Sequence, residues 1–193
     1  AASDVYKRQH VFLAEGFEDI EALGTVDILR RAGMEVKTVS ITDSHSVTSA
    51  HGVKVETDTL FDNTDFSGSD LLVLPGGMPG AANLNAHDGL RRVLMSHNDN
   101  NKRIAAICAA PMVLGGLGIL NGKRATCYPG FEKYLDGATY TRELYVTDGN
   151  ITTGEGPAAT FPFAYELVRL LAGESTAAQL ADGMMFSHLM QSR

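Results

Sequence analysis

The sequence has no tryptophan, only two cysteines and six prolines, and no long apolar run among its 193 residues. A transmembrane helix needs about 18 or more consecutive apolar residues, so we expect no membrane span. The 16 basic residues are scattered and the 23 acidic residues outnumber them, which argues against nucleic acid and anionic membranes as partners. A small neutral or carbonyl-bearing ligand fits a net charge of −7 better. Without a cationic leader, and with so few cysteines, the chain is expected to be cytoplasmic with reduced thiols.

What the chain does contain is an alternation of short apolar runs with amphipathic stretches. This pattern is typical of parallel strands joined by crossover helices, and an apolar share of 44% suffices for a sizeable core. No repeat or linker is visible, so we predict one doubly wound, mostly parallel α/β domain with helices on both faces. Strands are predicted at 10–14, 34–41, 70–77, 103–107, 124–128, 143–147 and 150–154, helices at 17–33, 88–96, 109–120, 157–172 and 176–184, and a hairpin-like excursion at 47–58.

The first nine residues, AASDVYKRQ, do not share this pattern. The piece SDVYKRQ resembles translated adapter sequence, so we expect residues 1–9 to be a non-native leader and the domain to span 10–193. In doubly wound folds, ligands bind outside the carboxyl ends of the strands. The three strand ends to inspect are therefore 14–16, 75–77 and 107–109.

Cys108 stands where an apolar strand meets a helix, in the stretch IAAICAAPMVLGG. This is the layout of a nucleophile elbow, which needs small neighbours and carries backbone strain of about 1–3 kcal/mol. The positive end of the following helix is expected to lower the pKa of the thiol below its free value of roughly 8.5. The alternative is an inert, buried packing residue, since free cysteines are among the most buried residue types.

Two further segments favour the reactive interpretation. Gly76 and Gly77 end an apolar strand and permit close backbone approach, so the Gly77 N–H is expected to join that of Ala109 in an oxyanion hole, although Pro-Gly-Gly is more often a plain turn. Glu21 lies one turn into the first helix, beside apolar Ile20 and Leu23. We expect its carboxyl to face inward with a raised pKa, to stay protonated near neutrality, and to donate a hydrogen bond to a thiolate.

Five segments together resemble the DJ-one/ThiJ/PfpI superfamily: AEGFEDIEAL, LVLPGG, AAICAAP, RATCYPGFE and TTGEGPAATFPFA. The resemblance runs in order from about residue 10 to 172 and is strongest to the branch of the Parkinsonism-associated deglycase and its bacterial YajL-like relatives. It implies a flavodoxin-like sandwich, akin to class I glutamine amidotransferases, and a homodimer. It also implies that Cys108 is an oxidisable nucleophile, that Glu21 hydrogen-bonds it, and that Gly77 and Ala109 are the backbone donors around it.

The sequence departs from the family pattern near the cysteine. Ala109 stands where the protease and glyoxalase branches have a histidine, and Tyr128 stands where the animal relative has one. Two family arginines, one of them contributed across the dimer, are replaced by Glu155 and His51, which weakens the case for an anion site. Gly76, His51 and Tyr128 are accordingly predicted as possible pocket residues rather than as catalytic groups.

For the remaining histidines and the second cysteine, we predict no role in the chemistry of the site. His10, His45, His87, His97 and His188 lie in polar or terminal contexts without a second ligand at a metal-like spacing, so we expect surface residues and no metal. Cys127 is expected to be a packing residue, with a resolving thiol as the alternative. No cofactor is predicted.

Three functions use the same thiol and carboxyl. The first is a glyoxalase or deglycase acting on methylglyoxal-type α-oxoaldehydes or on their adducts with protein side chains. The second is a peroxide-sensing stress protein or chaperone in which Cys108 is oxidised to sulfinate. The third, weakened by Ala109, is a PfpI-like cysteine peptidase or amidase. A glutamine-amidotransferase-like domain with an inert cysteine is the non-catalytic alternative.

Overall fold

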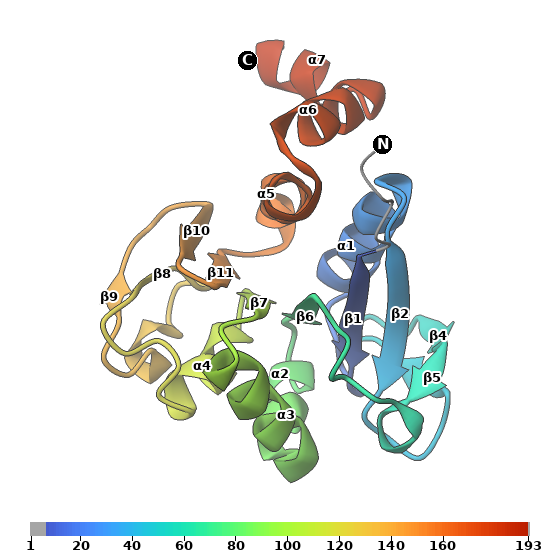
Figure 1. The fold of residues 1–193 in the computed structure, drawn as a ribbon, viewed down its shortest axis with the longest axis vertical. Helices are drawn as coiled ribbons and strands as arrows, with labels where there is room; N and C mark the ends of the chain where they lie inside the picture. Colours follow the sequence, from blue (N-terminus) through green and yellow to red (C-terminus); the bar gives the residue numbers. More distant parts are fainter. Residues whose placement is uncertain (1–6, 193) are drawn as a thin grey trace.

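A seven-stranded sheet forms the centre of the structure, a computed structural model that describes residues 7–192 (Figure 1). The strand order is β10-β11-β7-β6-β1-β2-β5, and neighbours pair in parallel except β10 with β11. This order confirms the predicted mostly parallel sheet. The strands are β1 (Arg8–Leu13), β2 (Glu35–Ser40), β5 (Thr59–Leu60), β6 (Leu71–Leu74), β7 (Arg103–Ile107), β10 (Tyr145–Asp148) and β11 (Ile151–Gly154).

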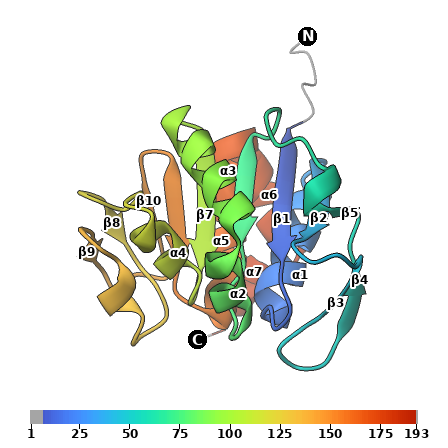
Figure 2. The same ribbon diagram turned by 90° about the horizontal axis from the view of Figure 1, so that it is seen from below.

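Helices cover both faces of the sheet, as predicted (Figures 1 and 2). On one face α1 packs against α5, and α6 and α7 follow beyond α5; α2, α3 and α4 lie on the other face. Their bounds are α1 (Asp19–Arg31), α2 (Gly80–Ala86), α3 (Asp88–Asp99), α4 (Pro111–Gly116), α5 (Thr160–Ala172), α6 (Glu174–Gly183) and α7 (Phe186–Gln191), with 3-10 turns η1 (Phe61–Asn63), η2 (Glu132–Tyr134) and η3 (Pro157–Ala159). Within residues 7–192, no helix combines the length and the apolar character that a membrane crossing requires.

The central strands are buried on both faces, which is why they read as unbroken apolar runs in the sequence. Along β1, Val11 and Leu13 belong to the core beneath α1 and α5, while Phe12 points into the core beneath α2, α3 and α4. All four residues of β6 are buried as well. Two hydrophobic layers therefore hold the sheet between its helices, and the strand ends at the carboxyl edge are fixed in place.

Two short strand pairs lie outside the main sheet. The predicted hairpin is confirmed as antiparallel β3 (Ser46–Thr48) and β4 (Lys54–Glu56), with Gly52 at a positive φ of 82° in the bend. The strand predicted at 124–128 is shorter: only β8 (Arg124–Ala125) is extended, and it pairs in parallel with β9 (Thr139–Tyr140).

Several boundaries differ from the predictions. The first strand begins at Arg8, two residues before the predicted start, because Arg8 and Gln9 pair with β2; residues 1–6 of the predicted leader lie outside the described residues. The helix predicted at 109–120 ends at Gly116, since the run of glycines there is a poor helix former. The sequence pattern does not predict the short helices α2 and α7, which contain glycine, asparagine or other polar residues.

Two histidines predicted to lie on the surface are buried, and the structure corrects this expectation. His10 is 6% exposed and His97 is 5% exposed, because one lies in β1 and the other on the sheet-facing side of α3. The ring of His97 bonds through Nε2 to the backbone oxygen of Arg103 at 3.0 Å and so ties α3 to β7. Burial lowers the pKa of His97 to about 4.

We predict that His97 makes the fold sensitive to acid. Its pKa is lower in the folded than in the unfolded chain, so the stability it contributes is present above about pH 6.5 and is lost as the pH falls towards 4. At pH 5 this loss amounts to about 2 kcal/mol relative to pH 7, at 1.36 kcal/mol per pH unit. In urea unfolding, the free energy of unfolding of His97→Gln should change clearly less between pH 7 and pH 5 than that of the wild type. The exposed His188→Gln should behave like the wild type, and equal acid losses in all three proteins would refute the assignment.

Candidate active site

Cys108 lies at the carboxyl end of β7, in a sharply turned backbone. Its φ is +67°, a left-handed conformation that side chains other than glycine rarely adopt and that costs about 1–3 kcal/mol. The backbone is held on both sides: Cys108 N–H donates to Gly154 O, and its carbonyl accepts from Tyr128 N–H, both at 2.9 Å. The predicted elbow geometry is therefore present, with the strain balanced by hydrogen bonds from two other segments.

Glu21 reaches the same corner from the first turn of α1. The helix starts at the N-cap Glu18, whose carboxylate accepts the Glu21 N–H at 2.8 Å. From there Glu21, Thr25 and Ile28 follow at helical spacing on the buried face, each with no exposed surface. The inward orientation of Glu21 agrees with the prediction, but Ile20 and Leu23, which supported it, are 53% and 37% exposed.

Gly76 allows the thiol and the carboxyl to meet. Its N–H donates to Glu21 Oε1 at 3.0 Å, and a Cβ at this position would lie 2.6 Å from Cys108 Cβ and 2.7 Å from that carboxyl oxygen. Glu21 Oε2 is buried without a hydrogen-bond partner among the described residues, and the carboxyl and the Cys108 thiol are close enough to shift each other's pKa. Any side chain at position 76 would force the two groups apart.

The predicted backbone donors lie beside Cys108. The N–H groups of Gly77 and Ala109 favour the anionic form of the thiol and lower its pKa. Gly77 has a φ of +89° and packs so closely that a Cβ would lie 2.5 Å from Glu18 N. The structure thus brings together Cys108, Glu21, Gly76, Gly77 and Ala109, as the sequence predicted.

Tyr128 and Glu155 line a shallow hollow beside this corner. The hollow has a volume of about 300 Å³ and is walled mainly by apolar groups of the 128–129 and 155–159 segments. Tyr128 contacts Cys108 through its backbone, while its ring packs over Gly156 and is 47% exposed. Tyr128 therefore forms part of the wall of this hollow.

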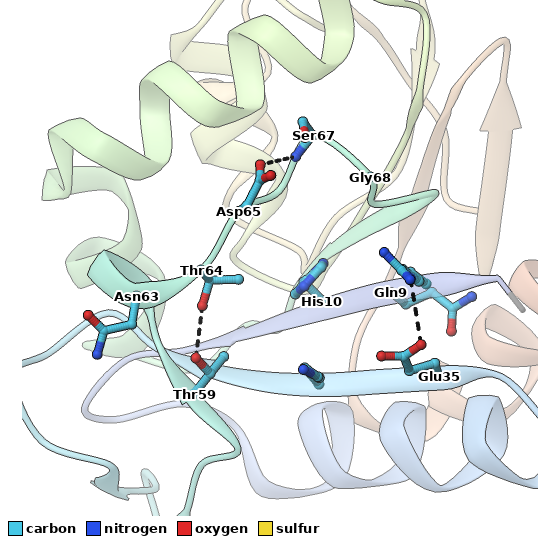
Figure 3. Close-up of a pocket in the computed structure, with 11 residues that line it drawn as sticks. Gln9, His10, Glu35, Thr59, Asn63, Thr64, Asp65, Ser67 and Gly68 are labelled. Atoms are coloured by element: carbon cyan, nitrogen blue, oxygen red, sulfur yellow. Dashed lines mark hydrogen bonds and ion pairs between the residues drawn. The ribbon is translucent and has the colours of Figure 1, made fainter.

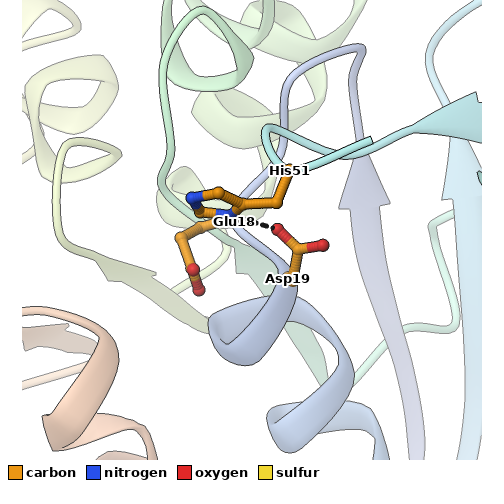
Figure 4. A group of neighbouring side chains, drawn as sticks. All are labelled: Glu18, Asp19 and His51. Carbon is orange, nitrogen blue, oxygen red and sulfur yellow. Dashed lines mark hydrogen bonds and ion pairs between the residues drawn. The ribbon is translucent and has the colours of Figure 1, made fainter. Parts of the chain in front are cut away.

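His51 pairs with Asp19 in the first turn of α1 (Figure 4). Its Nδ1 is 2.8 Å from Asp19 Oδ2, and ligand atoms of Glu18, Asp19 and His51 lie within 4.8 Å of one another. Sequence analysis missed this cluster because a loop brings His51 back to the helix start. Such a triad could hold a cation, but Glu18 already caps the helix, and the positive helix end opposes a metal ion, so we assign it as an ion pair.

Cys127 does not pair with Cys108. Both cysteines are free, and Cys127 is fully buried in the core beneath α2, α3 and α4. Burial, with Glu132 and Glu155 nearby, raises its pKa to about 12. Its surroundings agree with the predicted packing role.

Comparison with known proteins identifies the family. The profile of the DJ-1/PfpI family matches residues 7–170. The chain belongs to the DJ-1/PfpI family. It is 37% identical to the DJ-1 homolog B of Arabidopsis thaliana over 93% of this chain and 41% of that protein, so it spans less than half of that relative's length. It is also 33% identical to the deglycase PH1704 of Pyrococcus horikoshii, over 82% of this chain and 95% of that protein.

A solved structure of the same family agrees with this fold. The structure titled as oxidised DJ-1 of Toxoplasma gondii superposes with a TM-score of 0.89 at 33% identity, covering 93% of this chain and 98% of that one. The family resemblance seen in the sequence is thereby confirmed, together with its flavodoxin-like fold. The DJ-1/PfpI family thus includes a protein named a deglycase and another crystallised in an oxidised form.

In this DJ-1/PfpI chain, Glu21 has the electrostatics expected of a proton donor. Burial raises its pKa to about 7; Glu18 adds to the rise, while hydrogen bonds from Cys108 and the Gly76 N–H oppose it. A carboxyl group with such a pKa carries its proton in about half of the molecules at neutral pH. This environment agrees with the expectation that Glu21 is a protonated acid beside the sulfur.

The pKa of Cys108 differs from the prediction, because it is raised rather than lowered. Burial is the main cause, since the residue is only 8% exposed, and the negative charge of Glu21 is the second. The N–H groups of Gly77 and Ala109 oppose the rise without cancelling it. The predicted lowering of the pKa is wrong because burial and the charge of Glu21 outweigh the groups that stabilise the thiolate.

Together these effects make the thiol and the carboxyl share a single negative charge. Two acids in one buried site do not ionise together, so the first proton to leave belongs to the pair. When Glu21 keeps its proton, the repulsive charge beside Cys108 is gone and the carboxyl O–H can donate to the sulfur. The reactive thiolate therefore exists only while Glu21 is protonated.

We predict that alkylation of Cys108 follows the titration of this pair. In the native protein the iodoacetamide rate should rise about tenfold between pH 6 and pH 8, with its midpoint near 7. In Glu21→Gln no proton is shared, and burial should shift the midpoint above pH 9, by roughly 2 pH units. Peptide mass spectrometry separates Cys108 from Cys127, and Cys108→Ser supplies the background. Identical profiles in the native protein and in Glu21→Gln would disprove the shared charge.

Proposed function

We propose that this protein is a cofactor-independent, cysteine-dependent enzyme acting on methylglyoxal-type α-oxoaldehydes or on their adducts with protein side chains. The observation that carries the proposal is the buried contact of Cys108 with Glu21, made at a strained turn and flanked by the N–H groups of Gly77 and Ala109. The similarity to a relative named a deglycase supports the same class of substrate.

The chemistry begins with the sulfur of Cys108 attacking the aldehyde carbon of methylglyoxal. A carbon–sulfur bond forms, the carbonyl electrons move to oxygen, and the Gly77 and Ala109 N–H groups stabilise that oxyanion. Glu21 gives its proton to the oxyanion and becomes a carboxylate. The bound adduct is then a neutral hemithioacetal beside a base.

The second half of the reaction moves a proton between two carbons. The Glu21 carboxylate removes the proton from the former aldehyde carbon and returns it to the neighbouring carbon, while the hydroxyl proton moves from the former aldehyde oxygen to the neighbouring oxygen. Together these transfers convert the hemithioacetal into a thioester. Water then cleaves the carbon–sulfur bond, and lactate leaves with the thiol restored. Methylglyoxal plus water gives lactic acid, so no electron acceptor is required.

We expect lactate formation from methylglyoxal to fall to background in Cys108→Ala and by about 100-fold or more in Glu21→Gln, since proton transfer by a positioned group contributes that much. Lactate is measured enzymatically, and thermal unfolding shows that each variant is folded. Cys127→Ala removes a buried thiol that has no carboxyl partner, and it should retain its activity. Undiminished lactate production by folded Cys108→Ala would reject the proposal.

A second function is supported by a separate observation, the oxidised form of the Toxoplasma gondii relative. In this alternative, peroxide oxidises Cys108 to sulfinate, consuming two molecules of hydrogen peroxide and releasing two of water. Protonated Glu21 and the two N–H groups are suitable donors for the sulfinate oxygens. This oxidation would introduce a negative charge at Cys108. A stress-sensor or chaperone role would follow from that change of charge.

For this alternative we predict that mild peroxide adds the mass of two oxygen atoms to Cys108 and leaves Cys127 unmodified, because Cys127 is fully buried. In Glu21→Gln the oxidation should stop more often at sulfenate or proceed to sulfonate, since the carboxylic acid donor is absent. Intact-mass and peptide mass spectrometry distinguish these products. Oxidation of Cys127 ahead of Cys108 would speak against a sensing role.

The remaining family-derived expectations stay predictions. A homodimer and a cytoplasmic location follow from the resemblance and from the two free thiols. A peptidase or amidase has the least support, because Ala109 and not a histidine follows the nucleophile.

A further inference from the structure

A second hollow lies at the opposite edge of the sheet from Cys108, near the amino ends of β1 and β2 (Figure 3). Its volume is about 420 Å³, within the range of about 300–1,000 Å³ typical of small-molecule sites. His10 and Lys37, which pair in register on adjacent strands, present their side chains on this face, and the 63–68 segment lies across from them. This hollow shares no residue with the Cys108 site.

His10 and Gln9 are the buried polar groups among the residues that line this hollow, and the neighbour Ser69 bears on the tautomer of His10. His10 Nδ1 is 2.8 Å from Ser69 Oγ, and the Ser69 hydroxyl has its own acceptor, Leu71 O, at 3.0 Å. We assign the single Ser69 proton to that carbonyl, so that Nδ1 donates to Ser69 Oγ. In the neutral ring Nε2 then carries the lone pair.

The lone pair of His10 Nε2 has no hydrogen-bond donor among residues 7–192. The ring itself is fixed, since Ser69 holds one side and Phe66 packs edge-on at 5.0 Å between ring centroids. Burial, together with Lys37, lowers the pKa of His10 and keeps the ring neutral at pH 7. A fixed, 94%-buried acceptor directed into a hollow calls for a ligand that brings a donor.

The other groups around His10 indicate a ligand without net charge. Arg8 and Glu35 pair at 3.6 Å and offset each other, and Lys37 is matched by Asp65 across the hollow. The hydroxyls of Thr59 and Thr64, 2.9 Å apart, add groups that both donate and accept. An anion would meet the His10 lone pair, which repels it.

We propose that this hollow binds an uncharged polyhydroxylated molecule of monosaccharide size, with one hydroxyl donating to His10 Nε2 and others bonding Lys37 and the threonine hydroxyls. Hydroxyl groups that each donate and accept match this mixed lining better than a phosphate or a carboxylate does. The site is independent of the chemistry at Cys108.

The test is an NMR titration of the ¹⁵N-labelled protein with D-ribose and D-glucose. We expect a saturable shift of His10 Nε2, with Nδ1 protonated in the free protein. His10→Phe keeps the packing on Phe66 but removes the acceptor, so it should bind at least about tenfold more weakly. His188→Phe, which alters an exposed histidine in α7, should bind like the wild type.

Lys37→Met provides a second variant that does not depend on the folding of His10→Phe, because Lys37 is exposed. It should weaken binding severalfold. Absence of a saturable shift with either sugar, or undiminished binding by both variants, would overturn the proposal. Binding of D-ribose 5-phosphate without binding of D-ribose would refute the proposal that the ligand is uncharged.

Discussion

The structure depends on one close approach, that of the Cys108 thiol to the Glu21 carboxyl across Gly76. Two acids are brought together in a place with little water, and the only way to keep both there is to let them share a proton. Gly76 makes this possible twice over, by having no side chain and by giving its N–H to Glu21 Oε1. The chemistry of the corner follows from this backbone constraint more than from the cysteine alone.

The parallel sheet explains why such a corner can be held. β1, β6 and β7 are neighbours, so the segments after their carboxyl ends meet at one edge. The left-handed turn at Cys108 is disfavoured locally but is fixed by hydrogen bonds to Gly154 and Tyr128. Since these bonds come from segments distant in the chain, the strain at the nucleophile is offset only in the complete fold.

Much of this arrangement could be predicted from the sequence, and the failures have physical reasons. Apolar runs identified β6 and β7, and the small residues around Cys108 identified the elbow, because these signals are local. The pKa of Cys108 could not be predicted, since it depends on burial by distant segments. Glu21 was placed correctly from apolar neighbours that are themselves exposed, so that success rested on helix position rather than on packing.

Two buried titratable groups, Glu21 and His10, show opposite consequences of burial. At Glu21, loss of water favours the protonated acid and makes it a donor towards sulfur; at His10, loss of water favours the neutral ring and leaves it an acceptor. Each group sits in a rigid setting, one on a capped helix and the other on a central strand, so neither can turn away to find a partner within the protein. Because neither group can relieve its desolvation by moving, burial favours the neutral form at both positions.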